Sequence, residues 1–135
     1  PHTLEEKKNP YMTCPSGGPL VQHAVVAMFE AHHQGKISVE KIVEKMCHNP
    51  AKIFKIEKRG FIKEGYYADI AIVNAYLPWN VKKENILYKC GWSPFEGYNF
   101  KSRVTHTFVN GKLVYHNGKV KDLKVGKRLL FEREV

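Results

Sequence analysis

Residues 103–120 constrain the fold of this 135-residue chain more than any other stretch, because two Asn-Gly pairs divide them into short β-branched runs. The pairs are Asn110-Gly111 and Asn117-Gly118. Asn-Gly is the preferred pair for two-residue hairpin turns, since both turn positions adopt a positive φ. The second half of the chain is therefore predicted to form a small antiparallel β-sheet.

A further strand is predicted at residues 68–74, ADIAIVN, whose nearly continuous apolar run is typical of a strand covered on both faces. Residues 75–102 are rich in Pro, Trp, Asn and Gly, and we predict a long ordered loop there. A sheet of so few strands is marginal by itself. It therefore needs cover from other elements.

The first half of the chain is predicted to be helical, after an extended loop over residues 1–18. Pro19 suits a first helical position, and the helix that follows should end near Gly35. Ser38 is expected to cap a second helix, and Asn49-Pro50 to begin a short helical turn. The residues expected to face inward recur at helical spacing: Leu20, Ala24, Val25, Met28 and Phe29, then Val39, Ile42, Val43, Met46 and Cys47, then Ala51, Ile53 and Phe54.

Charge and composition exclude several classes of protein. Lys and Arg number 22 and Asp and Glu 13, a net charge of +9, but the basic residues are scattered, so no nucleic-acid partner is expected. No apolar run reaches the roughly 20 residues that span a bilayer, so no membrane association is expected. Cys14, Cys47 and Cys90 are odd in number and widely spaced. This pattern favours a reducing compartment, the cytoplasm, over disulfides or a zinc knuckle.

Two N-terminal features are candidate binding groups, and each has a structural alternative. His2 follows Pro1, whose ring fixes the local direction of the chain; an exposed terminal histidine is otherwise inert. The stretch CPSGGP, residues 14–19, places two glycines before a helix, where the backbone can approach an anion closely. The alternative is a plain loop-to-helix junction.

The histidines of the first helix are expected to be structural. Paired metal ligands on a helix need i, i+4 spacing, which His23, His32 and His33 do not have. We expect them at the surface or half-buried. No complete Ser/His/Asp trio or metal-ligand cluster is evident elsewhere in the sequence.

The stretch KCGWSPFEG, residues 89–97, has no mechanism of its own. Cys90 lacks a neighbouring base, which makes it a weak candidate nucleophile. Trp92 and Phe95 are expected to pack the long loop onto the core.

Several of these motifs occur in an order known from one enzyme family. Pro1-His2 followed by TLEEK resembles the end of an Asp-His-Ala-Pro-His motif, and CPSGGP resembles an Ala-Pro-x-Gly loop. The remaining motifs are GKISVEKIVEKMCHNPAKIF (35–54), GFIKEGYYADIAIVN (60–74), KCGWSPFEG and VTHTFVNGKLVYHNGKV (104–120). From Pro1 to about Val120 the chain thus resembles the C-terminal part of dihydroorotases, in the amidohydrolase superfamily.

The resemblance implies an α/β fold: the C-terminal fragment of a (β/α)8 TIM-barrel metallo-hydrolase, together with most of a small composite β-sandwich domain. Residues 1–56 would be the last loop and helices of the barrel, and residues 57–135 the sandwich without its N-terminal strands. A barrel takes about 250 residues. The implied partner is therefore the missing N-terminal part of the same protein, with a homo-oligomer as a further alternative.

The implied activity is the reversible cyclisation of N-carbamoyl-L-aspartate to L-dihydroorotate in pyrimidine biosynthesis, by a zinc-dependent cyclic amidohydrolase. The resemblance assigns the substrate carboxylate to His2 and backbone contacts to Ser16 and Gly17, with Cys14 and Pro15 shaping the approach to this small molecule. Cys14 is often Ala in the family, and Ser16 is often a larger apolar residue.

The ligands of the expected binuclear zinc centre would lie upstream, as would the proton-transferring Asp, just before Pro1. The 135 residues alone should then be inactive. Two alternatives remain open: a non-catalytic dihydroorotase-like scaffold, and another cyclic amidohydrolase of the dihydropyrimidinase or allantoinase type. The latter usually lack the histidine that matches His2.

Overall fold

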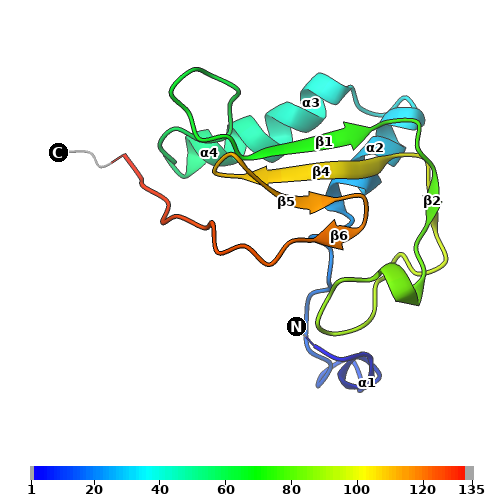
Figure 1. Cartoon of the computed structure of the whole chain (residues 1–135). Helices are drawn as coiled ribbons and strands as arrows, with labels where there is room; N and C mark the ends of the chain where they lie inside the picture. Colours follow the sequence, from blue (N-terminus) through cyan, green and yellow to red (C-terminus); the bar gives the residue numbers. More distant parts are fainter. Residues whose placement is uncertain (1, 133–135) are drawn as a thin grey trace.

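The computed structural model describes residues 2–132 (Figure 1). Pro1, on which part of the resemblance rests, lies outside the described residues. The helical elements are α1 (Leu4–Lys7), α2 (Ala24–His33), α3 (Val39–Val43), the π-helix η1 (Glu44–His48), α4 (Asn49–Ile53) and the 3-10 turn η2 (Lys83–Asn85). The strands are β1 (Ile70–Asn74), β2 (Trp79–Asn80), β3 (Asn99–Phe100), β4 (Arg103–Val109), β5 (Lys112–His116) and β6 (Lys119–Val120). No helix in this part of the chain is both long and apolar enough to cross a bilayer.

The main sheet is an antiparallel set in the order β1-β4-β5-β6. Both predicted hairpins are confirmed. Asn110 and Gly111 have φ values of 49° and 78°, and Asn117 and Gly118 have 45° and 89°. Positive φ at both central positions is what a type I′ turn requires.

The predicted loop over residues 75–102 contains more structure than expected. Strands β2 and β3 pair within it, with Trp79 opposite Phe100 and Asn80 opposite Asn99. The side chain of Asn80 donates to the carbonyl of Gly97 at 3.0 Å, and its own carbonyl accepts from Asn85 Nδ2 at 2.8 Å. These amide contacts hold the loop in a fixed path.

Helix α2 begins at Ala24, so the prediction of a helix starting at Pro19 is wrong. The backbone N–H groups of His23 and Ala24 both donate to the carbonyl of Leu20, at 3.0 and 2.8 Å, and form a turn ahead of the helix. Leu20 is correspondingly exposed, whereas Phe29 is buried as expected.

The second helix is longer than predicted, because α3, η1 and α4 follow one another without a break. Ser38 caps it as expected, its hydroxyl accepting from Lys41 N at 3.2 Å. Ile42 and Ala51 are buried, but Ile53 and Phe54 are 72% and 64% exposed. The expectation that the last two face inward is wrong within the described chain, because the helix stripe has turned away from the sheet there.

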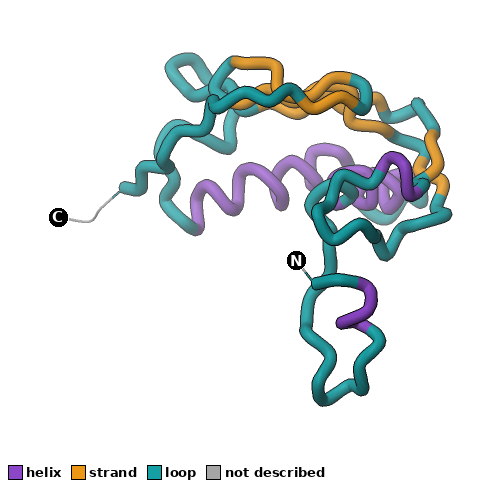
Figure 2. Tube along the Cα trace, turned by 60° about the horizontal axis from the view of Figure 1, so that its bottom comes forward, coloured by secondary structure: helices purple, strands orange, loops and turns teal. Residues whose placement is uncertain are grey.

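Strand β1 is not covered on both faces, contrary to the prediction. Ala71 is exposed and Ile72 is 45% exposed. The helices lie on one side of the sheet only (Figures 1 and 2). The β-branched composition therefore marked an apolar strand but not one enclosed by this part of the chain.

The buried core is small and lies where α2 meets the 79–104 segment. Val26, Val81 and Phe100 form its centre. Partly buried apolar residues pack around them: Ala27, Trp79, Ile86, Phe95 and Val104. Phe95 thus packs as predicted. The division of the chain near residue 56 stays a prediction.

A polar network joins the start of β1 to the first hairpin. Arg59 forms an ion pair with Asp69 and donates to Asn110 Oδ1 at 3.1 Å. Asp69 in turn accepts from the backbone N–H of Asn110 at 2.7 Å. The C-terminal tail then runs back to residues 55–57, where Glu57 N donates to the carbonyl of Leu130 at 2.9 Å.

Gly60 lies against the long helix and has no room for a side chain. A Cβ there would approach Ala51 Cβ to 2.5 Å and the Cys47 carbonyl oxygen to 2.7 Å, and its φ is +78°. Gly65 has nearly the same φ, +79°, and apart from its two chain neighbours no atom of the described chain lies within 4 Å of its would-be Cβ.

We expect Gly60→Ala to lower the free energy of unfolding more than Gly65→Ala. Both substitutions carry the positive-φ penalty of about 1–2 kcal/mol, but only Gly60→Ala adds overpacking, typically about 1–3 kcal/mol. Chemical denaturation of the two variants measures the difference. Equal losses would show that the contact with Ala51 and Cys47 is not tight.

Candidate substrate-binding pocket

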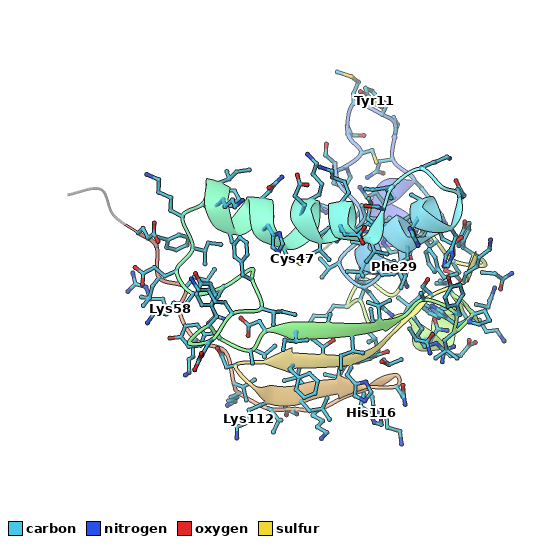
Figure 3. All side chains as sticks on the ribbon, turned by 90° about the horizontal axis from the view of Figure 1, so that it is seen from above. Tyr11, Phe29, Cys47, Lys58, Lys112 and His116 are labelled. Carbon is cyan, nitrogen blue, oxygen red and sulfur yellow. The ribbon has the colours of Figure 1, made fainter. Side chains whose placement is uncertain are left out.

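Residues 2–18 form a folded lobe that projects from the body of the protein (Figures 1 and 2). Figure 3 shows Tyr11 at its outer tip, 93% exposed. The lobe is not the extended loop that was predicted, because Thr3 and Glu6 form a capping box that starts α1. Thr3 N and Oγ1 donate to Glu6 Oε2 at 2.5 and 2.9 Å. These bonds lower the pKa of Glu6 below its usual value. The Thr-x-x-Glu spacing was a local signal for this turn.

Lys7 closes the lobe on itself. Its ammonium group donates to the carbonyl oxygens of Pro15 and Gly17, and its own carbonyl accepts from the Cys14 thiol at 3.5 Å. Two backbone carbonyls, eight and ten residues beyond Lys7, are thus held by one cation. The lysine keeps the glycine-containing segment folded back beside the N-terminus.

The folded lobe and the 85–97 loop enclose a pocket of about 180 Å³. It is lined by His2, Lys7, Gly17, Gly18, Pro19, Cys90 and Trp92. The indole N–H of Trp92 donates to the His2 carbonyl at 2.9 Å. The side chain of His2 is about half exposed, with Nδ1 3.9 Å from Glu6 Oε2. Its imidazole is therefore open to a ligand.

Two of the four predicted site residues meet in this pocket. His2 and Gly17 line it, whereas Pro15 contributes its carbonyl to Lys7 and Ser16 lies exposed beside it. Trp92 was expected in the core and lies against His2 instead, so that prediction is wrong. A larger hollow of about 420 Å³ runs along the tail at Glu57 and residues 128–131. It contains none of the predicted site residues, and we assign no chemistry to it.

The pocket is suited to binding an anion rather than to performing a reaction. Lys7 supplies a fixed positive charge, His2 an imidazole donor, and the two glycines allow a ligand to approach the backbone. Among residues 2–132, no three His, Cys, Asp or Glu side chains gather closely enough to hold a metal ion. The described residues therefore do not fit a zinc centre.

His23 is the functional group whose position the sequence did not predict. Expected at the surface or half-buried, it is fully buried. Its ring is stacked with those of Trp79 and Phe100, at centroid distances of 5.7 and 6.0 Å. Nδ1 lies 3.1 Å from Ser93 Oγ and 3.3 Å from the Tyr88 hydroxyl. Burial lowers the pKa of His23, because desolvation disfavours the charged imidazolium.

A family model described as the amidohydrolase family matches residues 13–114. The chain belongs to this family. It is 36% identical over 130 residues to the dihydroorotase of Pyrococcus furiosus, covering 96% of this chain and 30% of that protein. It is 38% identical over 118 residues to the dihydroorotase of Endomicrobium trichonymphae, covering 85% of this chain and 28% of that one.

Among solved structures, a D-hydantoinase (dihydropyrimidinase) from Thermus sp. superimposes on 92% of this chain, and the match covers 28% of that chain. The TM-score is 0.80 and the sequence identity 21%, so this likeness concerns the fold alone. The chain spans about 30% of the length of the curated relatives it matches. As a member of the amidohydrolase family, it therefore corresponds to one part of those longer proteins.

In this member of the amidohydrolase family, we expect Lys7→Met to weaken the contacts that keep the lobe of residues 2–18 folded. The variant keeps the aliphatic stem but loses the donors to Pro15 and Gly17, so backbone amides within residues 9–18 should exchange about tenfold faster, the cost of roughly one charged hydrogen bond. Lys8→Met is the matched control, because the Lys8 ammonium group pairs with the exposed side chain of Glu5 at 2.7 Å and with no other group among residues 2–132. Hydrogen exchange read by mass spectrometry makes the comparison. Equal exchange in both variants would contradict the role of Lys7.

The buried His23 predicts a loss of stability in mild acid. In the unfolded chain its imidazole takes up a proton near its ordinary pKa of 6.5, whereas burial keeps it neutral to lower pH in the folded chain. The unfolded state then binds more protons, so the free energy of unfolding falls as the pH drops below about 6.5. Denaturation across this range should show a shallower pH dependence in His23→Asn. An unaltered slope in His23→Asn would refute the assignment.

Proposed function

We propose that these residues form the C-terminal, substrate-binding part of a dihydroorotase, which interconverts N-carbamoyl-L-aspartate and L-dihydroorotate. One observation carries the proposal: His2 and Gly17 meet in one cationic pocket, in a chain similar to dihydroorotases over nearly its whole length. Both molecules of this reaction carry carboxylates. An imidazole donor beside a lysine and two glycines is the surrounding that such an anion needs.

In this proposal His2 donates to the substrate carboxylate, and Lys7 adds a fixed positive potential behind it. Gly17 and Gly18 allow the substrate to reach backbone N–H groups that a side chain would cover, and the same role is assigned to Ser16. Pro15 restricts the path of the chain before these residues. These groups bind and orient the substrate, and none of them performs the chemical step.

The chemical step belongs to the rest of the enzyme. Zinc bound elsewhere in the enzyme would supply the activation of water, and we place its ligands and the proton-transferring Asp outside the described residues. Ile53, Phe54 and Ile72 expose apolar surface within these residues. This exposed surface favours the proposal that it is covered by the N-terminal part of the same protein, which would contribute the rest of the barrel and further sandwich strands.

A dihydropyrimidinase-like activity is a weaker candidate. The likeness to the D-hydantoinase, at 21% identity, concerns the fold alone, whereas the identity to a dihydroorotase is 36%. A non-catalytic scaffold is the other alternative, and it predicts neither bound zinc nor turnover of dihydroorotate by the full-length protein. Turnover of dihydropyrimidine in preference to dihydroorotate would favour the first of these alternatives.

We expect His2→Ala in the full-length protein to raise KM for dihydroorotate by about tenfold or more, because a hydrogen bond to a charged group is lost. Zinc content should be unchanged, since His2 is assigned to substrate and not to metal. His116→Ala is the matched control, because His116 is an exposed histidine at the end of β5 and is not among the residues that line the pocket. Loss of zinc in His2→Ala, or an unchanged KM, would refute the assigned role.

A further inference from the structure

We propose that His23 is a positioning residue for the binding pocket: its imidazole fixes the loop that carries Trp92, and Trp92 fixes His2. The inference rests on the proposed function for its effect on substrate, but its structural part stands on contacts alone. The two parts fail in distinguishable ways in the experiment below.

Two hydroxyl groups lie beside Nδ1 of His23, and their other hydrogen bonds bear on the direction of these contacts. Ser93 Oγ already accepts the backbone N–H of Phe95 at 3.1 Å, and the Tyr88 hydroxyl accepts that of Gln22 at 2.9 Å. Each hydroxyl therefore has its own proton free to donate, and both lie close to Nδ1 of His23. We assign the role of acceptor to Nδ1, with the proton of the neutral imidazole on Nε2, because this tautomer uses a free hydroxyl proton.

The Nδ1 atom of His23 is shielded from water, so a water molecule cannot take its place as acceptor. His23 is fully buried and Ser93 is 6% exposed. His23 Nε2 has no hydrogen-bond partner among residues 2–132. Burying a polar atom without a hydrogen-bond partner lowers the free energy of unfolding. A polar side chain kept here at a cost to stability is consistent with its role in ordering the loop.

The segment of residues 85–93 connects His23 to the pocket. Gln22, the preceding residue, also holds this loop: its Nε2 donates to the Asn85 carbonyl and its Oε1 accepts from Leu87 N, both at 2.8 Å. Residues 85–93 are thereby fixed at both ends of the segment. Trp92 directly precedes Ser93, and its indole donates to the His2 carbonyl at 2.9 Å. The chain of contacts thus runs from α2 through Ser93 and Trp92 to His2.

Another histidine of the α2 segment, His33, offers a matched control. His33 lies on α2 and contacts the hydroxyl of a buried serine, Ser102, at 2.9 Å. It therefore makes the same kind of hydrogen bond as His23. Ser102 donates to the Ala75 carbonyl at 3.0 Å, and neither His33 nor Ser102 is among the residues that line the pocket.

The test compares His23→Leu, His23→Asn and His33→Leu in the full-length protein, by hydrogen exchange and by steady-state kinetics with dihydroorotate. In His23→Leu, amides of residues 85–96 and 2–18 should exchange about tenfold faster and KM should rise about tenfold, because the acceptor for two hydroxyls is lost. The value of kcat should change less than KM, because the chemical step is elsewhere. His23→Asn places an amide oxygen near the position of Nδ1 and should recover most of both effects.

His33→Leu should affect neither segment nor KM, even where it lowers stability to a similar extent. Exchange of residues 2–18 that is unchanged in His23→Leu, or faster to the same degree in His33→Leu, overturns the positioning role. Faster exchange with an unchanged KM retains the positioning role and contradicts the assignment of His2 to substrate. If His23→Leu does not fold, Tyr88→Phe, which keeps the ring and removes one donor to Nδ1, should show the same changes at reduced size, and its failure to do so overturns the proposal.

Discussion

The buried imidazole of His23 is the interaction on which the rest of the site depends. It lies where α2, the β2–β3 pair and the 85–97 loop come together, in contact with Trp79, Tyr88, Ser93 and Phe100. A burial of this kind is stable only while the ring is neutral and its acceptor is satisfied. The loop that it holds reaches the N-terminal lobe, so a core contact sets the geometry of a surface pocket.

The pocket is a binding surface built from two separately stabilised pieces. The lobe of residues 2–18 is closed locally by the capping box and by Lys7, and it meets the body at the Trp92–His2 hydrogen bond. The described residues contain no metal-ligand cluster, and the pocket between the two pieces is where we propose that an anion binds.

Local signals in the sequence predicted local structure well. The Asn-Gly turns, the Ser38 cap and the packing of Phe95 each depend on a few neighbouring residues or on general burial, and all are confirmed. His2 and Gly17 were assigned by family resemblance and do meet in one pocket. The predicted positions of Trp92 and His23 were wrong, because their hydrogen-bond partners are distant in the sequence. The partner of Trp92 is 90 positions away, and those of His23 are 65 and 70 positions away. No periodicity or spacing carries that information.

The central claim is that the His2 pocket receives the carboxylate of the substrate. The most direct measurement is a crystal structure of the full-length protein with dihydroorotate bound. The account predicts a substrate carboxylate oxygen within about 2.7–3.2 Å of a His2 ring nitrogen, the ordinary hydrogen-bond distance, with Gly17 at its side. A substrate bound in the barrel with its carboxylate held by other residues, and His2 facing solvent, would contradict it.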